Sequence, residues 1–514
     1  MKFLVSKFVA RTAGIAGSTT IVFAASLAAQ TPGPPPASVA GQATCDIDNS
    51  RPQTITRATF SLARAQSAMK TGSPTKDLRD VIAGLNNPGY KDENPVARAY
   101  ILGQAYMILM EQPGVQPITP RAAIGIATDP TGVIDLYAAT DSMWKIVEAR
   151  SPACAVVGGQ WRQQKPWMNV TNAAINALNA GKLDSAEILA KRSLLLDRNA
   201  PYAYSVIASV ARSKKDYATA SEYWKKTLAA AGTDTSYNDI RERTLYDVAS
   251  SATMRADAAT PAEQKALARQ VIDAWNAVFA NSSDDLQQSA AVQQLAKFYV
   301  IAGDSMSMGK IYAPIAADPK RFGEGTLMQA GVTASQFKHP DDAAHLFSAV
   351  LDGNPYQRDA LNNLAASYIF LSQYDKVFPL VTRLTAIDPS NPENWMLNAY
   401  SYAGLLKTTK PGKLNKQYTD SLVFYSGKAD KMQVKVTITE FTRGADGTTI
   451  VGTIENKGTS AQTYSIGMDL LDQAGQVLAT ESQSVGPVAA KTTKEFRIKS
   501  AKGGVIAYRY KPLT

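Results

Sequence analysis

Apolar residues recur at helical spacing along most of the chain and change to strict alternation near its carboxyl end. Residues 324–391 contain two units, each with an apolar helix, a short turn, a second apolar helix and a proline-containing exit. Pro355 and Pro389 are 34 residues apart (389 − 355). Leu327 and Leu361 keep the same interval. The pattern predicts consecutive helix–turn–helix units.

A 34-residue period with this content resembles the tetratricopeptide repeat (TPR), whose helical pairs stack into a solenoid. Ala186 and Ala220 keep the same interval further upstream. The resemblance implies a mainly α fold, with a TPR-like α-solenoid of antiparallel helix pairs over residues 161–427. Residues 45–160 are expected to form a degenerate N-terminal helical block that caps the stack, because end repeats depart from the pattern. Within that block, the prolines and glycines of residues 112–132 predict a long loop or a broken helix.

The period of the apolar residues changes from 3.6 to 2 near Ala429. Residues 432–439 alternate cleanly, and Val434 and Val436 point to the same side. Similar short runs follow as far as residue 510, separated by glycine-containing turns. This spacing predicts a small antiparallel β-sandwich of two sheets over residues 430–514.

The predicted sandwich also resembles the FxLYD family, a small immunoglobulin-like family with the signature Phe-x-Leu-Tyr-Asp. The matching stretch is residues 468–472, in which Leu470 and Asp472 agree with the signature. Met468 and Leu471 stand where the signature has aromatic residues. The resemblance implies an accessory or binding module with no known catalysis.

The N-terminal 29 residues have the pattern of a secretory signal peptide. Lys2, Lys7 and Arg11 precede an apolar segment that ends in small residues. The alternative is an uncleaved membrane anchor, but serine and threonine interrupt the segment, which favours cleavage. Residues 30–44 are rich in proline and predict an extended linker. No later stretch is long and apolar enough to span a bilayer, so we expect a periplasmic or secreted protein.

Cys45 and Cys154 are the only cysteines in the chain. An oxidising compartment outside the cytoplasm would allow them to form a disulfide bond. That bond would tie the segment after the linker to the end of the first helical block. Two buried thiols are the alternative.

The charge distribution argues against nucleic acid as a partner. The formal net charge is +10, but it is spread over 514 residues. No basic run with interleaved aromatic residues is present, and such a run is the usual footprint of a nucleic-acid-binding surface.

Candidate catalytic or metal-binding residues are sparse, because His339 and His345 are the only histidines. With Asp341 and Asp342 between them they could bind a transition metal. However, His339 falls in the turn between paired helices, and acidic residues stabilise the start of a helix. We therefore expect no metal, no cofactor and no catalysis that depends on histidine.

The first helices of tetratricopeptide repeats line a concave surface that accepts peptides, so the resemblance implies a groove. We predict that the following residues line it: Tyr202, Ser205, Ser209, Arg212, Met328, Val332, Ser335, Asn362, Ala366, Ile369 and Phe370. The prediction is a non-enzymatic scaffold of the cell envelope that binds a partner protein or peptide. The alternative is a carbohydrate- or cell-wall-associated protein that binds through its β-sandwich. Exposed rings at Tyr464, Tyr508 and Tyr510 would favour that alternative.

Overall fold

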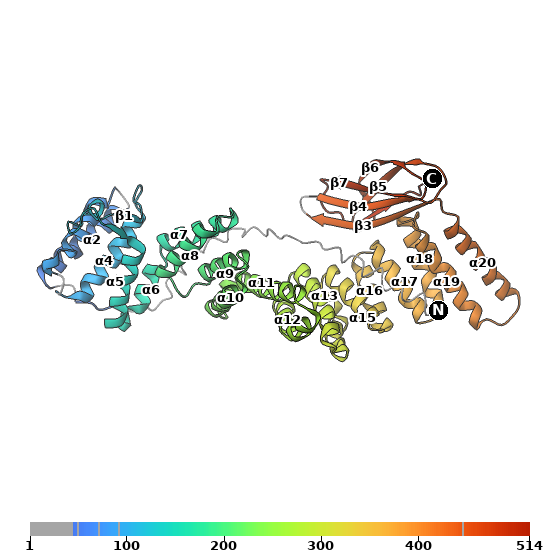
Figure 1. The fold of residues 1–514 in the computed structure, drawn as a ribbon, viewed down its shortest axis with the longest axis horizontal. Coiled ribbons are helices and arrows are strands. Elements are labelled where there is room, and N and C mark those ends of the chain that lie inside the picture. Colours follow the sequence, from blue (N-terminus) through green and yellow to red (C-terminus); the bar gives the residue numbers. More distant parts are fainter. Residues whose placement is uncertain (1–44, 49–50, 70–71, 91–92, 445–446, 514) are drawn as a thin grey trace. The chain divides into compact units, whose positions relative to one another are not determined.

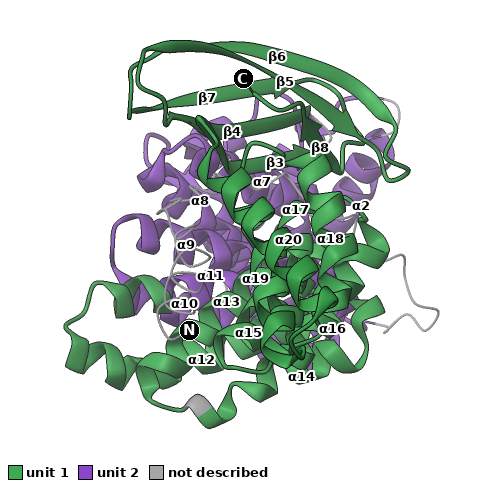
Figure 2. Ribbon diagram, turned by 90° about the vertical axis from the view of Figure 1, so that its right-hand side faces the viewer, with its two compact units in different colours: residues 1–19, 252–514 green, residues 20–251 purple. Residues whose placement is uncertain are grey.

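The computed structural model describes residues 45–48, 51–69, 72–90, 93–444 and 447–513 (Figure 1). The chain divides into two compact units, which Figure 2 labels unit 2 (residues 20–251) and unit 1 (residues 1–19 and 252–514). Helices make up most of both units, and a β-sandwich follows the helices of unit 1. None of the described helices combines the length and the apolar character needed to cross a membrane.

Unit 2 consists of paired helices. Its elements are α2 (Gln53–Ala68), α3 (Thr75–Leu85), η2 (Pro88–Tyr90), α4 (Pro95–Met110), β1 (Ile118–Pro120), η3 (Arg121–Ile124), β2 (Val133–Asp135), α5 (Leu136–Arg150), η4 (Pro152–Cys154), α6 (Ala155–Arg162), α7 (Lys165–Asn179), α8 (Leu183–Leu196), α9 (Tyr202–Ser213), α10 (Tyr217–Ala231), η5 (Thr235–Tyr237) and α11 (Asn238–Asp257), which crosses into unit 1. Contacts pair α2 with α3, α4 with α5, α7 with α8, and α9 with α10. The two pairs from α7 to α10 match the helix–turn–helix units that the sequence predicts.

Helix α4 forms the centre of the first helical block. All its residues from Ile101 to Met110 are buried. The indole ring of Trp144 in α5 packs against Gly103, where a Cβ atom would lie 3.0 Å from the ring. Tyr100 meets the same indole edge-on, with ring centroids 5.8 Å apart. A larger residue in place of Gly103 would therefore displace the tryptophan from the core.

The predicted disulfide bond is confirmed, because Cys45 and Cys154 are joined in the structure. The bond connects the segment before α2 to η4 and spans 109 positions of sequence. Trp144 and Val147 form the buried cluster beside Cys154. A crosslink across so long a segment restricts the unfolded chain, which stabilises the folded block by roughly 2–5 kcal/mol.

The prediction of a loop or broken helix at residues 112–132 is wrong in part. That range contains β1 and η3, and β1 pairs antiparallel with β2, which begins directly after the range. Proline is tolerated at the ends of such short edge strands, because its missing N–H is not needed for pairing. Asp135 ends β2 and is the N-cap of α5. Its Oδ1 accepts a hydrogen bond from the backbone N–H of Tyr137 (2.9 Å) in the first turn of that helix.

Unit 1 contains further helical pairs and then strands. After the end of α11, its elements are α12 (Pro261–Asn281), α13 (Asp285–Ala302), η6 (Ser305–Ser307), α14 (Gly309–Ala317), η7 (Pro319–Arg321), α15 (Glu324–Gln336), α16 (Pro340–Gly353), α17 (Arg358–Phe370), η8 (Tyr374–Lys376), α18 (Val377–Ile387), α19 (Pro392–Thr408), α20 (Lys413–Asp430), β3 (Val434–Gly444), β4 (Gly447–Asn456), β5 (Gln462–Leu471), β6 (Val477–Val488), β7 (Thr493–Ser500) and β8 (Ala507–Tyr510). The first helices of successive pairs contact one another, α13 with α15, α15 with α17, and α17 with α19. This stacking of helical pairs is the TPR-like arrangement that the 34-residue period predicts.

Each pair in the regular repeats fits a small residue of its first helix against a large residue of its second. A Cβ atom at Gly331 in α15 would lie 2.6 Å from the ring of Phe347 in α16. One period later, Ala365 and Val381 occupy the corresponding positions and are fully buried. The small residue allows the two helix axes to approach closely, and this requirement repeats through the stack.

Residues 434–510 form the antiparallel β-sandwich that the alternating pattern predicts. One sheet has the order β3-β4-β7 and the other has the order β6-β5-β8. Alternate residues such as Val436, Ile466 and Phe496 fill the space between the sheets. The Oδ1 atom of Asp472 accepts hydrogen bonds from the backbone N–H groups of Ala474 (2.9 Å) and Gln476 (2.8 Å), which holds the β5–β6 turn.

We predict that Gly331→Ala lowers the free energy of unfolding by about 1–3 kcal/mol, because the added methyl group overlaps the ring of Phe347. The matched control is Gly353→Ala at the end of α16, where an added Cβ atom has no neighbour within 4 Å. Chemical denaturation of the two variants and the parent protein measures the difference. Equal midpoints for both variants would refute the close-packing requirement.

Candidate functional site

In unit 2, helix α9 carries four of the residues predicted to line a groove: Tyr202, Ser205, Ser209 and Arg212. Two of the four already have partners within the chain. The ring of Tyr202 meets Tyr237 edge-on at 5.8 Å, and Arg212 forms an ion pair with Asp247. Ser205 is buried. These contacts hold α9 against η5 and α11, which gives part of the set a structural role.

In unit 1, the other predicted groove residues lie on two adjacent first helices. They are Met328, Val332 and Ser335 on α15, and Asn362, Ala366, Ile369 and Phe370 on α17. Phe370 is 57% exposed, and Ser335 is also exposed. Asn362 donates a weak hydrogen bond to Oδ1 of Asn394 in α19 (3.4 Å). Unit 1 therefore brings seven predicted residues onto neighbouring helices with an exposed aromatic ring at one end.

The β-sandwich lacks the exposed tyrosines that would favour carbohydrate binding. Tyr464, Tyr508 and Tyr510 are 4%, 6% and 3% exposed. Tyr508 packs edge-on against Phe441, with ring centroids 5.0 Å apart. The condition that would favour the carbohydrate- or cell-wall-binding alternative is therefore not met by these three rings, because they lie in the sandwich core.

A buried polar network joins the sandwich to the helices. Asp388, after α18, is 1% exposed and accepts hydrogen bonds from the hydroxyl of Tyr510 and from Nδ2 of Asn394 (2.9 Å). The guanidinium of Arg358 lies 3.8 Å from the same carboxylate. Burial, together with the negative charge of Asp388, raises the pKa of Tyr510 above its usual value. The tyrosine thus stays neutral and acts as a hydrogen-bond donor.

Further contacts fix the sandwich along the starts of successive helical pairs. Arg443 in β3 forms an ion pair with Glu324 at the start of α15 (2.8 Å). Nδ2 of Asn354 donates to the backbone oxygen of Ile506 (3.1 Å). The backbone N–H of Val436 donates to the backbone oxygen of Ser390 (3.0 Å). The sandwich is therefore held by several contacts to different repeats.

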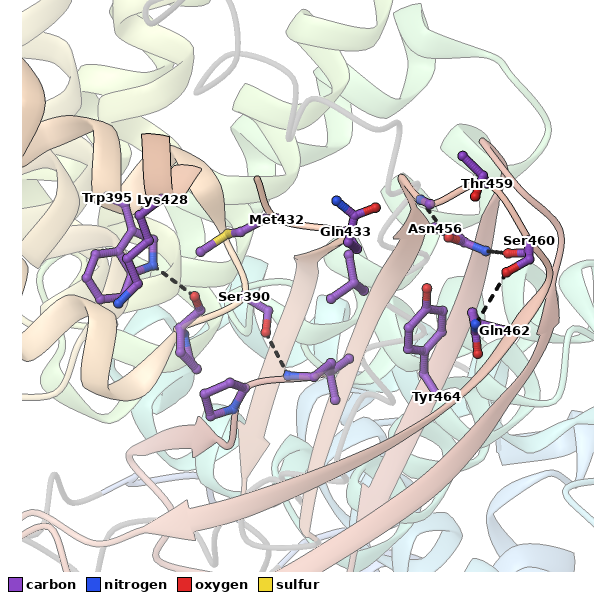
Figure 3. Close-up of a pocket in the computed structure, with 15 residues that line it drawn as sticks. Ser390, Trp395, Lys428, Met432, Gln433, Asn456, Thr459, Ser460, Gln462 and Tyr464 are labelled. Carbon is purple, nitrogen blue, oxygen red and sulfur yellow. Dashed lines mark hydrogen bonds between the residues drawn. The ribbon is translucent and has the colours of Figure 1, made fainter. Parts of the chain in front are cut away.

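A pocket of about 680 Å³ opens where the last helical pair meets the sandwich (Figure 3). It is lined by Pro389, Ser390, Trp395, Lys428, Met432, Gln433, Val434, Asn456, Gly458, Thr459, Ser460, Gln462, Tyr464, Pro512 and Leu513. Trp395 and Lys428 lie on the helical side, whereas Asn456, Ser460 and Gln462 lie on the sandwich side (Figure 3). Among the candidate binding residues predicted from the sequence, only Tyr464 lines this pocket.

One signal in the sequence does mark the pocket. Trp395 stands one period after Leu361 (395 − 361 = 34), where the two preceding repeats have leucine. Leu327 and Leu361 are both buried, whereas Trp395 is only half-buried. An aromatic residue at a repeat position that otherwise holds leucine can thus indicate a specialised surface.

The histidines have the local roles that the sequence suggests. His339 immediately precedes α16, and Asp341 and Asp342 lie in its first turn. A ring nitrogen of His345 forms a hydrogen bond with the backbone oxygen of Ala316 (3.1 Å). Within the described ranges, no group of three or more His, Cys, Asp or Glu side chains is arranged to hold a metal ion.

No protein-family model and no curated protein matches the chain. Among solved structures, MamA protein is similar, with 15% identity over 45% of this chain and 94% of that chain and a TM-score of 0.22. PilF of Pseudomonas aeruginosa has 15% identity over 50% and 88%, with a TM-score of 0.21. The TPR domain of P58(IPK) has 14% identity over 73% and 99%, with a TM-score of 0.16. The fold is defined by the contacts within and between the helical pairs themselves.

We predict that Asp388→Ala lowers the free energy of unfolding of unit 1 by about 1–3 kcal/mol, because it leaves the buried hydroxyl of Tyr510 without its acceptor, whereas Arg358 keeps its ion pair with Asp359. The control is Asp352→Ala, an exposed carboxylate at the end of α16 that should change stability by less than about 0.5 kcal/mol. Urea denaturation measures both. If Asp388→Ala unfolds at the same urea concentration as the control, the network does not hold the sandwich in place.

Proposed function

We propose that the protein is a non-enzymatic scaffold of the cell envelope that binds a partner protein or peptide along the first helices of its helical pairs. The observation that carries this proposal is the adjacent placement of α15 and α17 in unit 1. All seven predicted groove residues on these helices are half-buried or exposed. One of them, Asn362, also forms a hydrogen bond within the chain, to Asn394. Stacked helical pairs offer an extended face of this kind for recognition of a peptide or a helix.

Phe370 is the best candidate for an anchor on this face. Its ring is 57% exposed at the end of α17, next to the half-buried Ile369. Exposed aromatic side chains cost little conformational entropy when they bind, and they dominate the energy of many interfaces. The proposed partner therefore presents an apolar side chain to Phe370.

The proposed location outside the cytoplasm has two supports. One is the signal-like pattern of residues 1–29. The other is the disulfide bond between Cys45 and Cys154, because such bonds persist mainly in oxidising compartments.

We predict that Phe370→Ala reduces recovery of the partner at least about tenfold when the protein is crosslinked in exporting cells and purified, since loss of an anchor ring costs about 2 kcal/mol or more. Phe60→Ala is the matched control, because Phe60 in α2 is 69% exposed and lies outside the proposed face. Both variants should keep the parent's thermal unfolding temperature. Equal recovery with both variants would contradict the proposed face.

Fractionation of the same cells tests the location. We expect the mature chain in the exported fraction, without residues 1–29 and with no thiol that reacts after denaturation. A chain retained in the cytoplasm with two reactive thiols would contradict the envelope assignment.

A further inference from the structure

The pocket between the last helical pair and the sandwich is built from three kinds of surface. Its apolar part includes Val434, Met432 and Leu513. Uncharged hydrogen-bonding groups and one cation complete it. None of the fifteen described lining residues carries a carboxylate. Among the described lining residues, therefore, no side chain would neutralise a cationic ligand, and one positive charge would attract an anionic one.

The cation is the ammonium of Lys428. It lies 3.5 Å above the centroid of the Trp395 ring, which fixes its position through a cation–π interaction. The indole is held in turn, because its Nε1 donates to the backbone oxygen of Pro389 (3.0 Å) and its ring stacks on Tyr425. In the part of the chain that the structure describes, Lys428 has no carboxylate within ion-pair distance. A positioned lysine with no counter-ion is thus available to a ligand.

Tyr464 supplies a second polar group that faces the pocket. Its side chain is 4% exposed, and its hydroxyl points into the space between the labelled side chains (Figure 3). Among the described residues it has no hydrogen-bond partner. Burial raises the pKa of Tyr464, so the hydroxyl keeps its proton and can donate it in a hydrogen bond. The hydroxyl is open to the pocket, where a ligand can accept its hydrogen bond.

The opposite wall is uncharged and organised by Asn456. Its Nδ2 donates to the backbone oxygens of Ser460 (2.7 Å) and Val488 (2.9 Å), and its Oδ1 accepts from the N–H of Gly458 (2.9 Å). These bonds hold the β4–β5 loop, which presents the exposed hydroxyl of Thr459, and the amide of Gln462 follows at the start of β5. Such groups pair with amides or hydroxyls of a ligand.

We propose that this pocket binds an organic carboxylate that carries an apolar body and at least one amide or hydroxyl group. The carboxylate pairs with Lys428, the apolar body lies against Val434 and Leu513, and the amide or hydroxyl meets the β4–β5 loop and Tyr464. A single lysine matches a monoanion, whereas a phosphate dianion would keep an uncompensated charge. The C-terminal residue of a peptide and an acylated acid share this chemistry.

Isothermal titration calorimetry on the full exported chain tests the proposal with three probes. They are N-acetyl-Leu-Phe as the free acid, the same dipeptide as its C-terminal amide, and decanoate. We expect the free acid to bind one to one and the amide to bind at least about tenfold more weakly, because it lacks the charge. Equal affinity for acid and amide, or no binding of the acid, would overturn the proposal.

Two variants locate the binding site. Lys428→Gln should lower the affinity for the free acid about tenfold. The control is Lys416→Gln, at an exposed lysine of α20 outside the pocket, which should leave that affinity unchanged. Tyr464→Phe removes only the hydroxyl and should weaken binding about fivefold. Equal affinities for the variants at Lys428 and Lys416 would exclude the pocket as the site.

The remaining comparisons identify the source of the ligand. If the dipeptide binds more tightly than decanoate, the C-terminal end of a peptide is the favoured ligand. Equal binding of the two would show that the β4–β5 loop does not recognise the amide, which would overturn that part of the proposal. The Phe370→Ala variant should bind the dipeptide normally, because Phe370 does not line the pocket. The outcome here is thus independent of the proposed partner-binding face.

Discussion

The helical parts of this protein depend on one constraint, which is that a single helical pair cannot bury its own apolar surface. Each pair must cover the next, and close approach requires a small residue opposite a large one. Gly331 against Phe347 meets this requirement tightly, and Ala365 with Val381 meets it one period later. The first helices then lie side by side, so their remaining side chains form a continuous surface. Both the stability of the stack and its candidate binding face follow from the same packing.

The constraint creates a problem at the last pair, since no helical pair follows α20 in the described chain. Helix α20 buries only Ala429, and Val423 and Phe424 remain exposed. Stacked rings of Tyr402 and Tyr425 cover part of the surface between α19 and α20. The sandwich is fastened nearby through the buried carboxylate of Asp388. An apolar cap would need only contact, whereas this polar network requires one particular orientation of the sandwich, because every buried group must find its partner.

The sequence predicts those features that repeat or alternate. The 34-residue interval between Leu327 and Leu361 indicates the helical pairs, and the alternation around Val436 indicates the sandwich. The cysteine pair could be predicted because only two cysteines exist. Contacts between residues distant in sequence could not be predicted. The burial of Tyr510 could not be predicted for that reason, since its partner Asp388 lies 122 positions away in another type of structure. The contact between Tyr202 and Tyr237, which are also distant in sequence, could likewise not be predicted.

The pocket lies at the last helical pair of the stack, where a repeat position has a role other than packing. At the position of Trp395, the preceding repeats place Leu327 and Leu361, which are buried by neighbouring helical pairs. In the last pair this position is only partly covered, so a larger side chain can be accommodated there without overpacking the core. An indole that is half-buried can stack on one ring and hold a cation over its face. The sandwich supplies the other wall, and neither domain alone brings Lys428 and Tyr464 to one cavity. The position of Trp395 is not needed for packing against a following helical pair, and it is therefore available for binding a ligand.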